Sequence, residues 1–146
     1  MKLKQLSLFL ENKPGALSAP VRLLAGARIN ILTLSIAEAR QYGILRLIVS
    51  DWEAARKVLE KHGLVVKVTD VLAIEVPDHP GGLAAVLGVL EDAGLNLEYM
   101  YAFTGKHDGK GFFLFRFDDP DKAVAVLHKH KINAVGIAEL CQRLEG

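Results

Sequence analysis

The chain contains the stretch Glu11-Asn12-Lys13-Pro14-Gly15-Ala16-Leu17, and 66 residues later it contains Pro77-Asp78-His79-Pro80-Gly81-Gly82-Leu83, so the pattern Pro-Gly-x-Leu occurs twice. The same offset aligns Ala27-Arg28-Ile29-Asn30-Ile31 with Ala93-Gly94-Leu95-Asn96-Leu97. Further along, His62 corresponds to His130 at an offset of 68, which requires two inserted residues between the paired segments. This repeat predicts two copies of one small structural unit.

Each copy has the same expected order of strands and helices. In the first copy, residues 4–10 alternate between apolar and polar side chains, as a strand does. Pro14 suits the first turn of a helix, and the apolar spacing after it predicts a helix that ends at Gly26. The remaining expected elements are a hairpin of residues 30–38 and 43–50, a helix over 52–62 capped by Asp51, and a strand over 64–68.

The order strand-helix-strand-strand-helix-strand, present twice, predicts an α+β fold. With short right-handed connections, each copy folds as a ferredoxin-like βαββαβ unit, a four-stranded antiparallel sheet with its helices on one face. We place the two units at residues 1–69 and 70–146. Because Thr69-Asp70 is too short to be a free tether, we expect the two units to pack as one rigid body.

The composition excludes several classes of function. The 146 residues are 51% hydrophobic, which is enough for a packed core. Lys and Arg total 18 against 17 Asp and Glu, so no strong field attracts nucleic acid or an anionic membrane. The single cysteine, Cys141, excludes an intramolecular disulfide, and we expect its side chain to be buried. With no apolar run of ~20 residues and no recognisable signal peptide, we expect a soluble cytoplasmic protein.

The two loops and the two asparagine-containing segments that follow them resemble the ACT domain family, and the resemblance spans nearly all of the chain. Two such pairs at matched spacing indicate a tandem ACT-domain protein. The resemblance implies a regulatory module that binds a small molecule, most often an amino acid, at the interface between two ACT units. It also implies that this module tunes an enzyme, in the same chain or in a partner. We expect no cofactor.

The chemistry of these residues agrees with that implication. Gly15 and Gly81 lie where a strand ends and a helix begins, so a ligand can approach the backbone closely. A helix N-terminus offers unpaired amides and a partial positive charge for a carboxylate. Asn12 and Asn30 resemble the two positions that hold the ligand in amino-acid-binding members of the family. In the second copy Asp78 replaces the first of these asparagines, which favours one site or two unequal sites.

The candidate ligand-binding residues belong to the two loops and to the strands that follow the two asparagines: Asn12, Pro14, Gly15, Ala16, Leu17, Asn30, Ile31, Asp78, Gly81, Gly82, Leu83, Asn96, Leu97 and Tyr99. Structural roles remain open for several of them. The side chains of Asn12 and Asp78 can instead close an Asx turn ahead of each helix. Asn30 and Asn96 can instead hold the turn between helix and strand. Tyr99 either forms a pocket wall with Tyr101 or packs between sheets.

Residues 110–117 resemble the signature of the RNA-recognition motif, but Phe113 and Leu114 depart from it where a base would stack. The first copy has no aromatic residue in the corresponding segment, residues 44–49. Periodicity instead predicts that Phe113, Phe115 and Phe117 face the core, as Leu45, Leu47 and Val49 do in the first copy. We therefore expect no nucleic-acid partner.

The opposite face of each predicted sheet is too apolar for open water. It carries Ile44, Arg46 and Ile48 in the first copy and Phe112, Leu114 and Arg116 in the second. We expect a neighbouring unit or a second chain to cover this face, and a homodimer is the economical arrangement.

Metal and catalytic sites have weak support. His128 and His130 are two residues apart on a helix and point in different directions, so they do not chelate one ion. Asp78 and His79 are adjacent, but no nucleophile accompanies them. We expect a non-catalytic amino-acid sensor that modulates a partner protein. The alternative is a structural or protein-interaction module with vestigial ligand loops.

Overall fold

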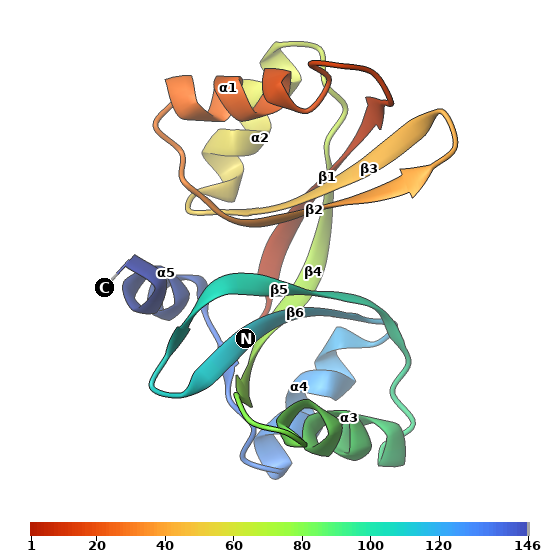
Figure 1. Cartoon of the computed structure of the whole chain (residues 1–146), viewed down its shortest axis with the longest axis vertical. Helices are drawn as coiled ribbons and strands as arrows, with labels where there is room; N and C mark the ends of the chain where they lie inside the picture. Colours follow the sequence, from red (N-terminus) through yellow and green to blue (C-terminus); the bar gives the residue numbers. More distant parts are fainter. Residues whose placement is uncertain (146) are drawn as a thin grey trace. The chain divides into compact units, whose positions relative to one another are not determined.

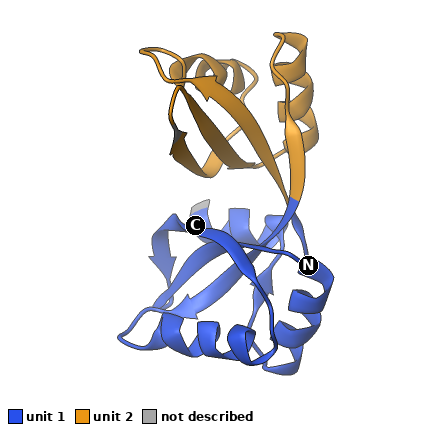
Figure 2. Ribbon diagram, turned by 90° about the vertical axis from the view of Figure 1, so that its right-hand side faces the viewer, with its two compact units in different colours: residues 1–3, 70–146 blue, residues 4–69 orange. Residues whose placement is uncertain are grey.

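The computed structural model describes residues 1–145 and separates them into two compact units (Figure 2). One, the N-terminal unit, comprises residues 4–69, and the other, the C-terminal unit, comprises residues 1–3 and 70–146. Both units have the predicted α+β order of elements, and the predicted fold class is confirmed. No helix in the described part of the chain is long and apolar enough to cross a membrane.

The N-terminal unit contains β1 (Leu3–Glu11), α1 (Ser18–Gly26), β2 (Ile31–Ala39), β3 (Tyr42–Val49), α2 (Trp52–Lys61) and the first residues of β4 (Lys67–Pro77). Strand β3 lies between β1 and β2 and is antiparallel to both, with Leu8 opposite Leu45. Helices α1 and α2 cover one face of this sheet (Figure 1). Asp51 caps α2 by accepting a hydrogen bond from the Ala54 amide at 3.1 Å, as predicted.

The C-terminal unit continues β4 and adds α3 (Gly82–Asp92), β5 (Leu97–His107), β6 (Lys110–Phe117), α4 (Pro120–Lys129) and β7 (Ala134–Val135). Strand β6 pairs with β5 and β4, and β7 pairs with the other edge of β4, all antiparallel. The strand expected at residues 64–68 begins only at Lys67 and continues without a break into the second copy as β4.

The core of each unit follows the predicted alternation of side chains. In the N-terminal unit, Leu45, Leu47 and Val49 are buried beneath the two helices. In the C-terminal unit, Phe115 and Phe117 take the corresponding places, with their rings stacked at a centroid distance of 5.8 Å, and Phe113 packs against the same core. The prediction that these phenylalanines serve the core is confirmed.

A helix that the sequence did not indicate, α5 (Ile137–Glu145), covers the other face of the C-terminal sheet, opposite α3 and α4 (Figure 1). It packs against β5, and Leu140 on it is fully buried. The Arg143 guanidinium lies 5.9 Å from the ring centroid of Phe112, a residue of the face we expected another unit or chain to cover. Part of that cover is therefore α5 itself. Cys141, expected to be buried, is half-buried on this helix.

Candidate functional site

The loop between β1 and α1 forms an open pocket of about 420 Å³, here called the N-terminal loop pocket. The backbone amide of Asn12 donates to the backbone carbonyl of Gln41 at 2.9 Å, which holds the loop beside the turn between β2 and β3. Gly15 has a φ of +84°, a conformation that glycine adopts without strain. The pocket is lined by Leu10, Glu11, Asn12, Lys13, Ala16, Leu17, Ile36, Glu38 and Gly43.

The Asn12 side chain is exposed and has no hydrogen-bond partner within the described residues 1–145. The Asx turn that it was free to form is therefore absent. Its neighbour Lys13 pairs with Glu11, Nζ to Oε2, at 3.0 Å. Leu17, at the N-cap of α1, offers no side-chain acceptor to the first amides of the helix. The loop thus presents an amide side chain next to an uncapped helix N-terminus.

The corresponding C-terminal loop pocket has a volume of about 340 Å³ and includes Asp78, Leu83 and Lys106. The Asp78 amide donates to the Gly109 carbonyl at 2.9 Å, so this loop also lies beside the turn of its hairpin. Gly81 has a φ of +88°, matching Gly15. The Asp78 carboxylate is 2.5 Å from the Lys106 ammonium. An ion pair therefore spans this pocket where the N-terminal loop pocket has an amide without a partner.

The two loops also differ where their helices begin. Helix α3 begins at Gly82, whereas α1 begins at Ser18, two residues later in the repeat. A Cβ atom on Gly82 would lie 2.0 Å from the Pro77 carbonyl oxygen, so only glycine fits there. The first loop has Ala16 at this position, which its longer course accommodates. The two pockets are therefore unequal in shape as well as in charge.

The second set of predicted site residues lies at the opposite end of each sheet. The Ser50 amide donates to the Asn30 carbonyl at 3.0 Å, at the start of β2. Since β2 has nine residues, Asn30 is about 25–30 Å from the hairpin turn beside Asn12 at roughly 3.3 Å per residue. In the C-terminal unit, Asn96 pairs through its backbone with Asp118, at the far end of β5 from Asp78.

Asn12 and Asn30 therefore do not meet within one unit, and neither do Asp78 and Asn96. The residues that follow the second asparagines share this separation, because Ile31, Leu97 and Tyr99 belong to the same strand ends. Asn30 and Asn96 hold their turns through the backbone, and their side-chain amides have no hydrogen bond within residues 1–145. One ligand held by both kinds of asparagine requires two different units or chains.

Sequence reasoning missed the contribution of the β-hairpins to the loop pockets. Ile36 and Glu38 of β2 line the N-terminal loop pocket, and Ala102 and Lys106 of β5 line the C-terminal one. The hairpin tip next to each loop was the available signal. No group of three or more metal-ligating side chains occurs in the described part of the chain. The pKa of the Lys2 ammonium is raised by its hydrogen bond with Asp121, and neither residue lines a loop pocket.

Comparisons with known proteins find similarity over nearly the whole chain. Its sequence matches the ACT domain pair family over residues 1–144. A protein of Bacteroides thetaiotaomicron with a crystal structure is 41% identical in sequence, with a TM-score of 0.90 over 96% of each chain. No curated protein matches the chain.

Two further solved structures share the fold at lower identity. The ligand-free regulatory subunit of aspartate kinase from Thermus thermophilus is 14% identical, with a TM-score of 0.60 over 86% of this chain and 91% of that chain. Aspartate kinase from Synechocystis is 20% identical, with a TM-score of 0.57 over 92% of this chain and 26% of that chain. In each case the likeness is one of fold.

Proposed function

Because the chain belongs to the ACT domain pair family, and has a regulatory role accordingly, we propose that it is a non-catalytic sensor of an amino acid that modulates a partner protein in the cytoplasm. The family match confirms the resemblance inferred from the repeated loops. We take residues 1–69 and 70–146 as the two ACT units of the pair. Aspartate kinase is by its name an enzyme that acts on an amino acid. The shared fold of its regulatory subunit supports an amino acid as the ligand class by analogy of fold alone.

The observation that carries the proposal is the Asn12 side chain beside the start of α1. An amide side chain supplies both a donor and an acceptor, so it can read the carboxylate and the ammonium group of an amino acid. At the start of α1 the Ala19 amide already donates to the Gly15 carbonyl and Pro20 has no N–H, so the Ser18 amide and the partial positive charge of the helix end are what α1 adds for the carboxylate. A volume of about 420 Å³ lies within the range of small-molecule sites.

We assign the ligand to the N-terminal loop pocket because Asp78 in the other loop is already paired with Lys106. A zwitterion entering that second pocket would have to break this ion pair. The ligand would complete its contacts with an asparagine from another unit or a second chain, since Asn30 lies far from Asn12 in its own unit. Binding would then favour one arrangement of the two partners over another, which is how such a site transmits a signal.

Two exposed residues support a homodimer as the second partner. Phe9 is 73% exposed and Tyr42 is 53% exposed, and both lie on the sheet face opposite α1 and α2, beside Ile44. Apolar side chains clustered on a sheet face are typical of a protein interface. A second copy of the chain on this face is the economical cover.

The test is a thermal-shift screen of the standard amino acids at millimolar concentration. Binding to the folded state raises the melting temperature. At a hundredfold excess of ligand over Kd, the free energy of unfolding increases by about 2.7 kcal/mol. Asn12→Ala removes the shift, and Gln142→Ala, which removes an exposed amide side chain on α5 that lines none of the pockets described, keeps it. If no amino acid produces a shift, the alternative of an interaction module with vestigial loops replaces the sensor.

A further inference from the structure

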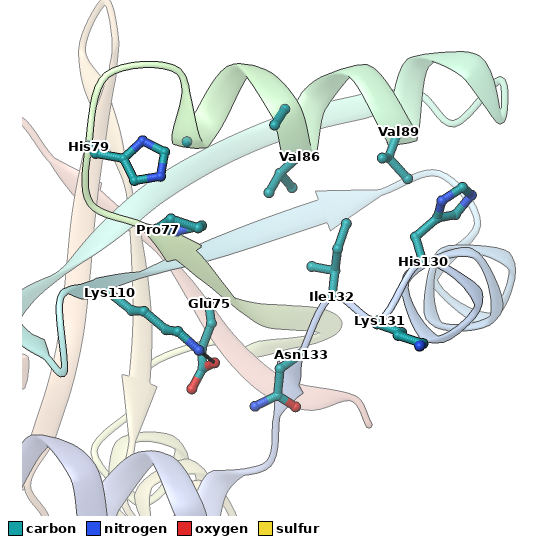
Figure 3. Close-up of a pocket in the computed structure, with 12 residues that line it drawn as sticks. Glu75, Pro77, His79, Val86, Val89, Lys110, His130, Lys131, Ile132 and Asn133 are labelled. Carbon is teal, nitrogen blue, oxygen red and sulfur yellow. Dashed lines mark hydrogen bonds and ion pairs between the residues drawn. The ribbon is translucent and has the colours of Figure 1, made fainter.

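The C-terminal unit contains a second open pocket, of about 450 Å³, between α3, β4 and the segment that leads into β7 (Figure 3). One end is apolar, with Val86 and Val89 of α3 pointing toward Ile132. The other end is polar, with Glu75 of β4 and Lys110 of β6 in contact (Figure 3). Here we call it the α3–β7 pocket.

Glu75 is the buried group of this pocket, with only 6% of its surface exposed. Its Oε2 atom accepts a hydrogen bond from the Lys110 ammonium at 3.3 Å, and its Oε1 atom contacts the Arg143 guanidinium of α5. One buried carboxylate therefore has two cationic partners. Lys110 remains 47% exposed, so its ammonium has donors directed to solvent. Among the residues that line the pocket, Lys110 and Lys131 are cationic against the single carboxylate of Glu75, so the lining carries a net positive charge.

From this arrangement we propose that the α3–β7 pocket binds a small monocarboxylate with an apolar body of roughly four to six carbons. The ligand carboxylate accepts a charge-assisted hydrogen bond from the Lys110 ammonium, while Arg143 continues to balance Glu75. The apolar body lies against Val86, Val89 and Ile132, which removes apolar surface from water. Lys131 at the rim adds to the attraction for an anion.

Other ligand classes fit the same groups poorly. Each Glu75 oxygen already contacts a cation, Lys110 or Arg143, so the ammonium of an amino acid or an amine would have to compete with these two side chains for the buried carboxylate. A neutral amide would lack the charge that the Lys110 ammonium favours. The site is thus distinct in chemistry from the N-terminal loop pocket, and it does not depend on the proposed function.

The N-terminal unit shows that this chemistry is not a property of the repeat. The positions that correspond to Glu75, Lys110 and Asn133 are occupied there by Phe9, Tyr42 and Val65. These three side chains are 73%, 53% and 85% exposed and carry no charge. The buried carboxylate and its cations therefore occur in the C-terminal unit alone among the described residues.

Isothermal titration calorimetry of the full chain with 4-methylpentanoate tests the proposal, with 4-methylpentanamide and 3-methylbutylamine as isosteric controls. We expect the acid to bind and the amide and amine to bind at least tenfold more weakly. Lys110→Met keeps the apolar stem of the side chain and weakens binding of the acid about tenfold, as loss of a charge-assisted hydrogen bond does. Lys129→Met, on the exposed side of α4, leaves it unchanged.

The proposal is overturned if the acid does not bind at 10 mM, or if the amide binds as well as the acid. Unchanged affinity in a folded Lys110→Met protein overturns it as well. Should that variant fail to fold, the comparison of acid, amide and amine on the unaltered protein still decides. Amino-acid binding that depends on Asn12 is measured separately, so failure of one proposal leaves the other intact.

Discussion

Glu75 on β4 and Arg143 on α5 form an ion pair that joins the C-terminal helix to the sheet of its unit. Glu75 is buried, whereas Arg143 is partly exposed and also pairs with Glu139 at 2.6 Å. The same guanidinium lies over the Phe112 ring. The Glu75 carboxylate is removed from water. Breaking the pair therefore destabilises the unit mainly because a buried charge is left with fewer partners, and less because the attraction between the two charges is lost.

Arg143→Met should therefore loosen α5 and lower the stability of the C-terminal unit. We expect a loss of about 1–3 kcal/mol in the free energy of unfolding, the range for a buried charged group that loses a hydrogen-bonding partner. Urea denaturation measures this loss, and hydrogen exchange locates it in residues 137–145. Arg56→Met is the matched control, because its pair with Glu60 is an exposed i,i+4 contact worth about 0.3–0.5 kcal/mol. Equal losses in both variants would contradict the buried role of Glu75.

Gly82→Ala should destabilise the protein, although alanine is the better helix former. The added Cβ would lie 2.0 Å from the Pro77 carbonyl oxygen, so the backbone of the loop or of α3 must shift. We expect a cost of roughly 1–3 kcal/mol, as for overpacking elsewhere. Gly88→Ala on the same helix has open space around its Cβ and should stabilise by about 0.5–1 kcal/mol. Thermal unfolding of both variants decides, and a Gly82→Ala protein as stable as the unaltered one, or more stable, would contradict the close approach to Pro77.

The features that the sequence predicts well depend on local chemistry. Gly15 and Gly81 have the positive φ expected of a strand-to-helix turn, and Phe115 and Phe117 face the core as their alternation requires. Helix α5 escaped prediction because only nine residues form it, and its burial depends on Leu140 meeting a sheet built from distant segments.

The site was predicted in part for the same reason. The loop pockets follow from the repeated motif, whereas the distance from Asn12 to Asn30 depends on the full length of β2. The pairing of Asp78 with Lys106 and the cations around Glu75 join residues from different strands. No spacing in the chain indicates such contacts, because they arise only when the sheet forms.

Asp78→Asn should convert the C-terminal loop pocket into a second site if the proposed function holds. The substitution removes the ion pair with Lys106 and supplies the same side chain that Asn12 presents in the other loop. We expect calorimetry with the amino acid found in the screen to show about twice the stoichiometry per chain of the unaltered protein. Asp92→Asn, at the other end of α3, is the matched control and keeps the original stoichiometry. An unchanged ratio in Asp78→Asn would mean that the ion pair is not what distinguishes the two loops.

Phe9→Glu should abolish the proposed homodimer without affecting the fold. Phe9 is 73% exposed and faces away from the two helices, so a charge there costs the folded monomer little but places a carboxylate within an apolar interface. Light scattering should give about twice the chain mass of 15.9 kDa for the unaltered protein and the single-chain mass for this variant. Leu34→Glu is the control, because Leu34 is also exposed, at 41%, but lies on the helix-bearing face opposite Leu47. If Leu34→Glu is a monomer and Phe9→Glu remains a dimer, the interface lies on the helix-bearing face instead.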